Sequence, residues 1–241
     1  MNPNLKIFIG YDSREKIAFH VLSYSIIAKA TIPVSITPIN LNNLKRFYNR
    51  PRGKNESTEF SISRFLTPYL SNFEGYSLYL DCDFIMLENV AKLLKFVAKK
   101  SNKTLWCVKH KYKPRDRTKF LKEKQFIYPK KNWSSFMLFN NKKCKILTPK
   151  IVSKAHGLYL HQFLWTNEKR LGSLPKNWNI LVKEQKIPKK INDEIEIILV
   201  SSVDEVLKYA LTKELKPVVN WVEVDTLPKS GKDDKTQAQT H

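Results

Sequence analysis

The sequence predicts an α/β protein with a mainly parallel central sheet flanked by helices. Residues 5–39 alternate strand, polar turn, helix and strand, an order that makes neighbouring strands parallel. A later apolar run has the length of a buried strand and ends in two acids, Asp81 and Asp83. Hydrophobic residues form 42% of the 241, enough for a sizeable core, which excludes wholesale disorder.

The first predicted elements form a β-loop-α-β unit. A strand over 5–10 ends at a polar turn, and Asp12 or Ser13 can cap the next helix, whose apolar residues recur at helical spacing over 17–26. A second strand is predicted over 34–39. Ligands of parallel sheets bind beyond the carboxyl ends of the strands, so the turn after the first strand is a candidate binding segment.

The remaining elements follow from apolar runs separated by polar segments. In order, we predict a basic loop at 40–59, a helix at 61–70, the strand ending at Asp81, a helix at 90–99, a strand at 104–108, a Lys-rich loop at 109–131, a strand at 133–140, a helix from Pro149 and an apolar segment at 160–165.

We predict three parts of the chain. Residues 1–182 form the main domain. Residues 183–228 form a short, foreign-looking α/β appendage with a strand at 196–200 and an amphipathic helix at 203–211. The polar residues 229–241 are predicted to be disordered.

The formal charge of +21 is concentrated in one stretch. Residues 95–145 hold 17 Lys and Arg but two acids. Such a block is either a solvated surface or a patch for nucleic acid, anionic lipid or phosphorylated sugars, and charge alone does not choose among them. Nucleic acid is disfavoured as a partner, since the chain has no recognised binding motif and few aromatics lie within the block.

No export or membrane signal is predicted. No apolar run approaches the roughly 20 residues that span a bilayer, and residues 1–4 lead into a strand without a signal peptide. Cys82, Cys107 and Cys144 lack metal-type spacing and indicate a reducing compartment. We expect a cytoplasmic protein whose basic block makes peripheral contact with an anionic membrane face.

Asp81 and Asp83 follow a predicted buried strand, whose interior cannot accommodate two ionised carboxylates. An ionised carboxylate loses its hydration on burial unless a counter-charge replaces it, so we expect both at the strand's exit. Oxygen ligands at this spacing suit Mn or Mg held together with substrate phosphates. A solvated strand end with two surface acids is the alternative, because D-x-D by itself is a weak motif.

Further polar side chains are predicted at the same edge of the sheet. Tyr11 ends the first strand and can stack on a base, and Arg64 can bind phosphate or hold Asp81. Together with the carboxylate pair they suit a nucleotide with a diphosphate. The alternatives are a surface aromatic at Tyr11 and a surface pair between Arg64 and Glu59.

Six blocks in order resemble a bacterial glycosyltransferase of the GT-A fold, similar to family 8 sugar transferases. They are 7–15 (Ile-Phe-Ile-Gly-Tyr-Asp-Ser-Arg-Glu), 61–65 (Ser-Ile-Ser-Arg-Phe), 79–83 (Tyr-Leu-Asp-Cys-Asp), 131–140, 160–165 and 171–179. The resemblance implies a nucleotide-sugar donor, a Mn or Mg ion and a glycan or glycolipid acceptor, such as a precursor of the bacterial envelope or lipopolysaccharide. It also implies transfer with retention of the anomeric configuration.

The resemblance implies donor-binding roles for five residues near the first and third strands. Tyr11 and Asp12 match the turn that contacts the nucleoside, and Arg64 matches the donor-site arginine. Asp81 and Asp83 match the metal-binding pair, with Asp81 also facing the ribose.

Four further positions match the surroundings of the transferred sugar. Asn132, Ser134 and Asn140 match polar positions near that sugar. Gln162 matches the position beneath the anomeric carbon, so the catalytic candidates are Gln162 and Asn132. His161 is either a metal ligand or a partly buried, hydrogen-bonded histidine.

The chain departs from this family after residue 182. Relatives continue to a His that supplies a third metal ligand and to a Gly-rich segment at the diphosphate, whereas this chain has no His between His161 and His241. Residues 187–215 instead resemble the tail of Lon-type proteases, which a gene fusion, a truncated open reading frame that runs into foreign sequence, or chance would explain. An impaired pseudoenzyme of the same fold is therefore an alternative to an active transferase.

Overall fold

The computed structural model describes residues 4–53, 56–97, 101–111, 129–182, 187–189 and 191. The chain divides into two units, Met1–Ile187 and Pro188–His241, and every helix and strand named below lies in the first. The strand predicted at 196–200, the helix at 203–211, the tail and most of the Lys-rich loop lie outside the described residues.

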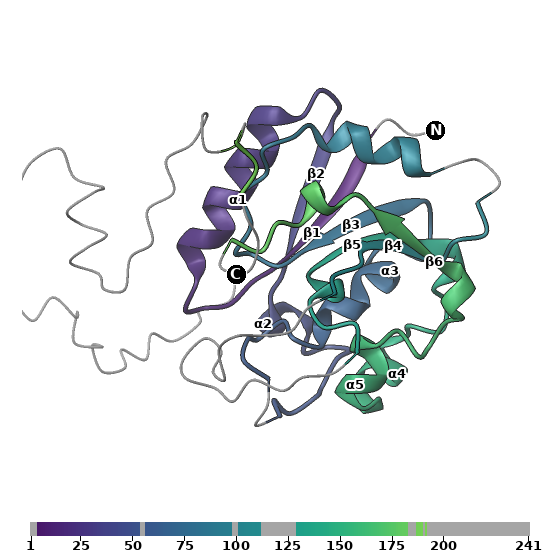
Figure 1. Ribbon diagram of the computed structural model, residues 1–241. Coiled ribbons are helices and arrows are strands. Elements are labelled where there is room, and N and C mark those ends of the chain that lie inside the picture. The colour runs from purple at the N-terminus through teal and green to yellow at the C-terminus, as the bar shows by residue number, and fades with distance from the viewer. Residues whose placement is uncertain are drawn as a thin grey trace, which may run out of the picture. The chain divides into compact units, whose positions relative to one another are not determined.

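A six-stranded sheet forms the centre of the first unit (Figure 1). Its strands are β1 (Leu5–Gly10), β2 (Val34–Ile39), β3 (Tyr76–Leu80), β4 (Leu105–Val108), β5 (Phe136–Asn140) and β6 (Leu171–Leu174), in the spatial order β2-β1-β3-β5-β4-β6. β1 pairs in parallel with β2 and β3, and β4 with β6, while β5 runs antiparallel to both neighbours. The predicted α/β class with a mainly parallel sheet is confirmed.

Short helices flank this sheet. They are α1 (Lys16–Lys29), α2 (Leu41–Leu44), α3 (Thr67–Leu70), α4 (Pro149–Lys154) and α5 (Gly157–His161), with 3-10 turns at Ser63–Leu66, Val90–Phe96, Trp133–Ser135, Asn141–Lys143, Glu168–Arg170 and Lys176–Trp178. In Figure 1, α1 lies on one side of the sheet, and α3, α4 and α5 lie on the other.

Three predicted helical features differ in the structure. The helix at 61–70 is a 3-10 turn followed by α3, because Pro68 at its start lacks an N–H and restricts the preceding residue. The helix at 90–99 is a 3-10 helix over Val90–Phe96. α1 begins after Glu15 without a side-chain cap, so neither predicted cap, Asp12 nor Ser13, caps it.

The core lies on both faces of the inner strands. Every residue of β3 after Tyr76 is buried, and so is every residue of β5, whereas the edge strand β2 has partly buried and exposed positions and only its last residue, Ile39, is buried. All three cysteines are free and buried in this core. Among the described residues, no helix is long and apolar enough to cross a bilayer.

Candidate functional site

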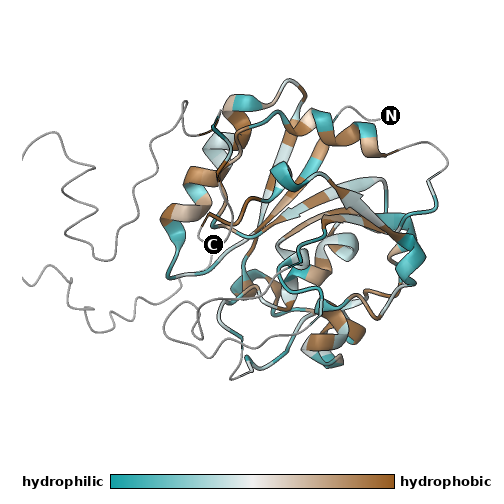
Figure 2. Cartoon of the chain, viewed as in Figure 1, coloured by the Kyte–Doolittle hydropathy of each residue, from teal (hydrophilic) through white to brown (hydrophobic). Residues whose placement is uncertain are grey.

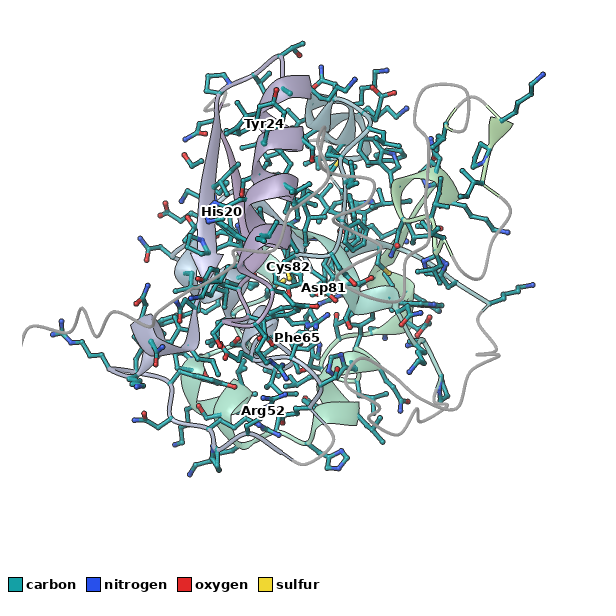
Figure 3. The ribbon with its side chains drawn as sticks, turned by 90° about the vertical axis from the view of Figure 1, so that its left-hand side faces the viewer. His20, Tyr24, Arg52, Phe65, Asp81 and Cys82 are labelled. Atoms are coloured by element: carbon teal, nitrogen blue, oxygen red, sulfur yellow. The ribbon has the colours of Figure 1, made fainter. Side chains whose placement is uncertain are left out.

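The carboxyl ends of β1 and β3 form the floor of the candidate site. The two strands are parallel neighbours, with Ile9 opposite Leu80. Asp12 and Asp81, which follow them, therefore emerge at the same edge of the sheet, as the sequence predicted. In Figure 3, Asp81 and Cys82 lie near the N-terminal end of α1.

Arg64 and Asp81 form an ion pair at this edge. Arg64 Nη1 lies 2.8 Å from Asp81 Oδ1 and also donates to Oδ2, and the same nitrogen donates to the backbone carbonyl of Ser134 at 3.0 Å. The arginine is only 6% exposed. Of the two partners considered from sequence, Asp81 is therefore the one Arg64 holds, while Glu59 accepts a hydrogen bond from Ser13.

Aromatic packing fixes the guanidinium of Arg64. Its Cζ lies 5.4 Å from the ring centroids of both Phe60 and Tyr79, within the range of cation–π attraction. Gly10 makes room for both rings, since a Cβ there would overlap the Phe60 ring and lie 2.7 Å from Tyr79 Oη. The end of β1 thus has to be a glycine for the arginine to be held in this way.

Burial and like charge act on the Asp-x-Asp pair. The pKa of Asp81 is raised to about 7. Burial is the largest cause, Arg64 opposes it, and the nearby Asp83 carboxylate adds to the rise. Asp83 is exposed, yet the protein around it removes enough hydration to raise its pKa as well. Burial thus disfavours the ionised form of both carboxyls, and a bound dication would offset this cost.

Asp12 is fully buried and satisfied by its own turn. It accepts hydrogen bonds from the Arg14 guanidinium at 2.6 and 2.8 Å and from the backbone amides of Arg14 and Glu59 at 3.0 Å. Burial disfavours the charged carboxylate, but these bonds outweigh it and lower the pKa of Asp12 to about 2. Asp12 therefore orders the turn that carries Tyr11, whose ring packs edge-on against Phe19.

Ser134 links the ion pair to α5. Its carbonyl accepts from Arg64, and its hydroxyl lies 2.8 Å from Nδ1 of His161, the last residue of that helix. Asn132 adopts a left-handed conformation at the start of the same turn, where its carbonyl accepts from Ser135. Gln162 follows His161, and its carbonyl accepts from Lys130.

Asn140 does not lie with these residues. β5 runs antiparallel to β3, so Asn140 pairs with Tyr76 at the opposite end of β3 from Asp81. Its amide nitrogen donates to the carbonyl of Lys103. A five-residue strand separates it from Ser134, roughly 16 Å along the sheet, and we leave it out of the candidate site.

Two contacts of the Asp81–Asp83 segment were not predicted from sequence. The Tyr79 hydroxyl donates to Asp81 Oδ1 at 2.9 Å, and Glu15 accepts from the thiol of Cys82 at 3.5 Å. Tyr79 was recognisable in principle, because residues two apart on a strand share a face. Glu15 was not, since its approach depends on how α1 packs.

The described residues suit a metal that is shared with a substrate. Among them no group of three or more His, Cys, Asp or Glu side chains could hold an ion by itself. Asp81 and Asp83 supply two carboxylates, the number that Mg²⁺ commonly takes from a protein when substrate phosphates complete its shell. Burial raises the pKa of both carboxyls and a dication would offset that cost, so the pair fits Mn or Mg bound together with a diphosphate.

No family model matches the chain, but one characterised sequence does. Protein CDI of Arabidopsis thaliana is 42% identical over 189 residues, which cover 77% of this chain and 72% of the plant protein.

Solved structures with a partial likeness are glycosyltransferases. GlyE of Streptococcus pneumoniae (14% identity, 74% of this chain, 47% of that one, TM-score 0.44) and the bifunctional WbbM (14%, 74%, 40%, TM-score 0.48) are more than twice as long as the segment matched. The galactosyltransferase LgtC, solved with donor and acceptor sugar analogues, is 10% identical over 71% of this chain and 74% of its own, with a TM-score of 0.43.

Proposed function

The chain belongs to the same protein family as Protein CDI of Arabidopsis thaliana, and from the site of this family member we propose that it transfers a sugar from a nucleotide-sugar donor to a glycan or glycolipid acceptor. The reaction would use Mn or Mg and retain the anomeric configuration. The observation that carries the proposal is the Arg64–Asp81 pair, with Asp83 exposed beside it at the carboxyl edge of the sheet.

The two carboxylates take different parts in this proposal. Asp81 is held in place by Arg64 and Tyr79, which suits a ligand whose position must not vary. Asp83 is exposed, so in this proposal it meets the incoming ligand. A divalent ion bound to both would stabilise the negative charge that develops on the departing diphosphate.

The turn after β1 is the proposed nucleoside site. Tyr11 is partly exposed at the strand end, where its ring can stack on a base. Asp12 is occupied by Arg14 and by the amide of Glu59, so we assign it the positioning of this turn rather than direct contact with the nucleoside.

The segment over Asn132, Ser134 and Gln162 is the proposed sugar site. Ser134 is tied to both Arg64 and His161, which places the segment beside Asp81. Side chains of this kind hold the hydroxyls of a sugar and keep water from the anomeric centre. In this proposal Gln162 and Asn132 lie nearest the reacting carbon.

A catalytically impaired nucleotide-sugar binder is the second candidate. The observation that favours it is the small metal-binding set: among the described residues, no group of three or more acidic, His or Cys side chains is arranged to hold an ion. Such a site still binds a metal–diphosphate complex, but it fixes the position of that complex less well.

The test is a panel of nucleotide-sugars offered to the full chain with and without Mn²⁺. Release of the nucleoside diphosphate that needs Mn²⁺ and is lost in Asp83→Asn supports the transferase. Binding of the donor without release, also lost in Asp83→Asn, supports the second candidate. The proposal is wrong if no donor binds, or if the chain binds nucleic acid tightly and Asp83→Asn has no effect on it.

A further inference from the structure

The outward face of α1 is apolar. Ile17 is 79% exposed, Tyr24 75%, Ile27 61% and Val21 44%. Their spacing of three, four and seven residues puts them on one side of the helix. An outer helix of an α/β domain ordinarily shows charged side chains there, so this surface, which we call the α1 face, is unusual.

The opposite side of α1 is firmly attached to the domain. Leu22 and Ile26 are fully buried, and the hydroxyl of Ser25 accepts a hydrogen bond from the backbone amide of Met86. The helix therefore cannot rotate to bury its outer residues without losing this packing. In Figure 3, α1 crosses the front of the molecule with His20 and Tyr24 along it, and Figure 2 shows its hydrophobic colouring.

The charged residues of α1 itself are all of one sign, and Glu15, which precedes the helix, is partly buried and accepts a hydrogen bond from the buried Cys82. The helix contains no Asp or Glu, and Lys16 and Lys29 occupy its two ends. An exposed apolar strip between cationic ends, with a tyrosine in it, offers the apolar area and the attraction to acidic headgroups on which binding at an anionic bilayer surface depends. The chain as a whole carries +21, which adds attraction to the same surface.

We propose that the α1 face docks on an anionic membrane, with Ile17, Val21 and Tyr24 entering the boundary between headgroups and acyl chains and Lys16 and Lys29 meeting acidic headgroups. The docking does not depend on the sugar-transfer proposal. A helix of 14 residues, about 21 Å long, lies along the surface and does not cross it.

A second copy of the chain is a poorer occupant of this face. In an antiparallel pair of α1 helices, Lys16 of one copy lies beside Lys29 of the other, and in a parallel pair each lysine meets its equivalent. The helix offers no acid to neutralise either contact. Two molecules of charge +21 also repel each other, whereas an anionic surface attracts both.

The experiment compares two pairs of substitutions in the full chain. Ile17→Glu/Val21→Glu changes the α1 face, and Ile146→Glu/Leu164→Glu changes two residues of similar exposure elsewhere, with the same change in net charge. Binding is measured by sedimentation with phosphatidylcholine vesicles that contain or lack phosphatidylserine. Thermal unfolding of both variants checks that the fold is kept.

A fluorescent label then reports on insertion. Tyr24→Cys is labelled with an environment-sensitive fluorophore, and Leu164→Cys is the control. Both positions are exposed, while the three native cysteines are buried and react slowly. Addition of anionic vesicles should shift the emission at residue 24 to the blue and leave that at residue 164 unchanged.

We expect Ile17→Glu/Val21→Glu to weaken binding to phosphatidylserine vesicles at least about tenfold more than Ile146→Glu/Leu164→Glu does. Both pairs lower the net charge equally, but only the first prevents insertion of apolar side chains. Equal weakening by both pairs, or no binding by the unmodified chain, overturns the proposal. Two further results would overturn it: a label at residue 24 that is shielded before vesicles are added, or a concentration-dependent dimer that Ile17→Glu/Val21→Glu abolishes. Either result means that protein covers the α1 face.

Discussion

A single guanidinium nitrogen of Arg64 contacts both carboxylate oxygens of Asp81, at 2.8 Å from Oδ1 and 3.1 Å from Oδ2. The same nitrogen also donates to the carbonyl of Ser134. Asp81 is thus fixed from one side by a cation that is itself fixed by two aromatic rings, Phe60 and Tyr79. The Asp81 side chain is still 17% exposed, which leaves it accessible to a ligand.

Replacement of Arg64 by Lys should weaken both the fold and the site. An ammonium group lacks the planar guanidinium that packs against the Phe60 and Tyr79 rings and donates through Nε to the Phe60 carbonyl, so it would be held less firmly beside Asp81. We expect a loss of about 1–3 kcal/mol in the free energy of unfolding and a fall of more than about tenfold in donor affinity. Urea unfolding and donor titration measure these. Arg52→Lys, at an exposed site, is the control and should change stability by no more than about 0.5 kcal/mol.

The carboxyl of Asp81 should make stability depend on pH near neutrality. Its pKa is about 7 in the fold against 3.8 ordinarily. The folded state therefore binds the proton more tightly, and stability falls as the pH rises from about 4 through 7. Urea unfolding at several pH values should show this fall in the unmodified chain and less of it in Asp81→Asn. Parallel profiles for the two proteins would refute the assignment.

The same group predicts how the metal depends on pH. A metal ion needs the ionised carboxylate, so binding of Mn²⁺ with a nucleoside diphosphate should weaken below pH 7, by up to about tenfold for each pH unit. Isothermal titration at pH 6 and pH 8 tests this. Added Mn²⁺ and nucleotide should also raise the melting temperature more at the higher pH.

Asp12 should have the opposite effect on the pH profile. Its lowered pKa contributes stability that is present above about pH 4 and is lost as the pH falls towards 2. Asp12→Ala leaves the Glu59 amide and the Arg14 side chain without this acceptor, and we expect a loss of about 2–3 kcal/mol at pH 7. The cost should shrink in acid. An unchanged cost at pH 2.5 would mean that packing, not charge, is responsible.

Gly10→Ala should disturb the site without touching a polar group. The added methyl overlaps Phe60 and approaches Tyr79 Oη, so both rings and the guanidinium of Arg64 must move. We expect a loss of about 1–3 kcal/mol in stability together with weaker donor binding. Gly157→Ala is the matched control, because its Cβ meets only Ile62 Cδ1 at 3.4 Å. The explanation fails if both substitutions have the same effect on donor binding.

Ser134→Ala and Asn140→Ala test the extent of the sugar site. Ser134 lies beside Asp81, whereas Asn140 lies at the far end of β5. We expect Ser134→Ala to lower kcat/KM by about tenfold, the worth of one strong hydrogen bond, and Asn140→Ala to leave it within about twofold once folding is confirmed. If Asn140→Ala lowers kcat/KM more than Ser134→Ala does, Asn140 belongs to the sugar site.

Local sequence determined the elements that carry the site. The bounds of β1 and β2 agree with the predicted strands, and the acids after β3 stand at its exit as predicted, because a buried strand cannot accommodate adjacent anions. Short-range periodicity and the cost of dehydrating a charge suffice for these conclusions. Neither requires knowledge of where distant parts of the chain lie.

Tertiary structure decided which residues meet. Arg64 pairs with Asp81 and not with Glu59, five positions away, because the sheet brings the end of β3 to it. Asn140 lies outside the site because β5 runs antiparallel to β3. The direction of a strand is set by its neighbours in the sheet and not by its own residues. The exposed apolar face of α1 was decided in the same way: apolar residues recur at helical spacing over 17–26, but only packing shows that Leu22 and Ile26 are covered while Ile17 and Val21 are exposed.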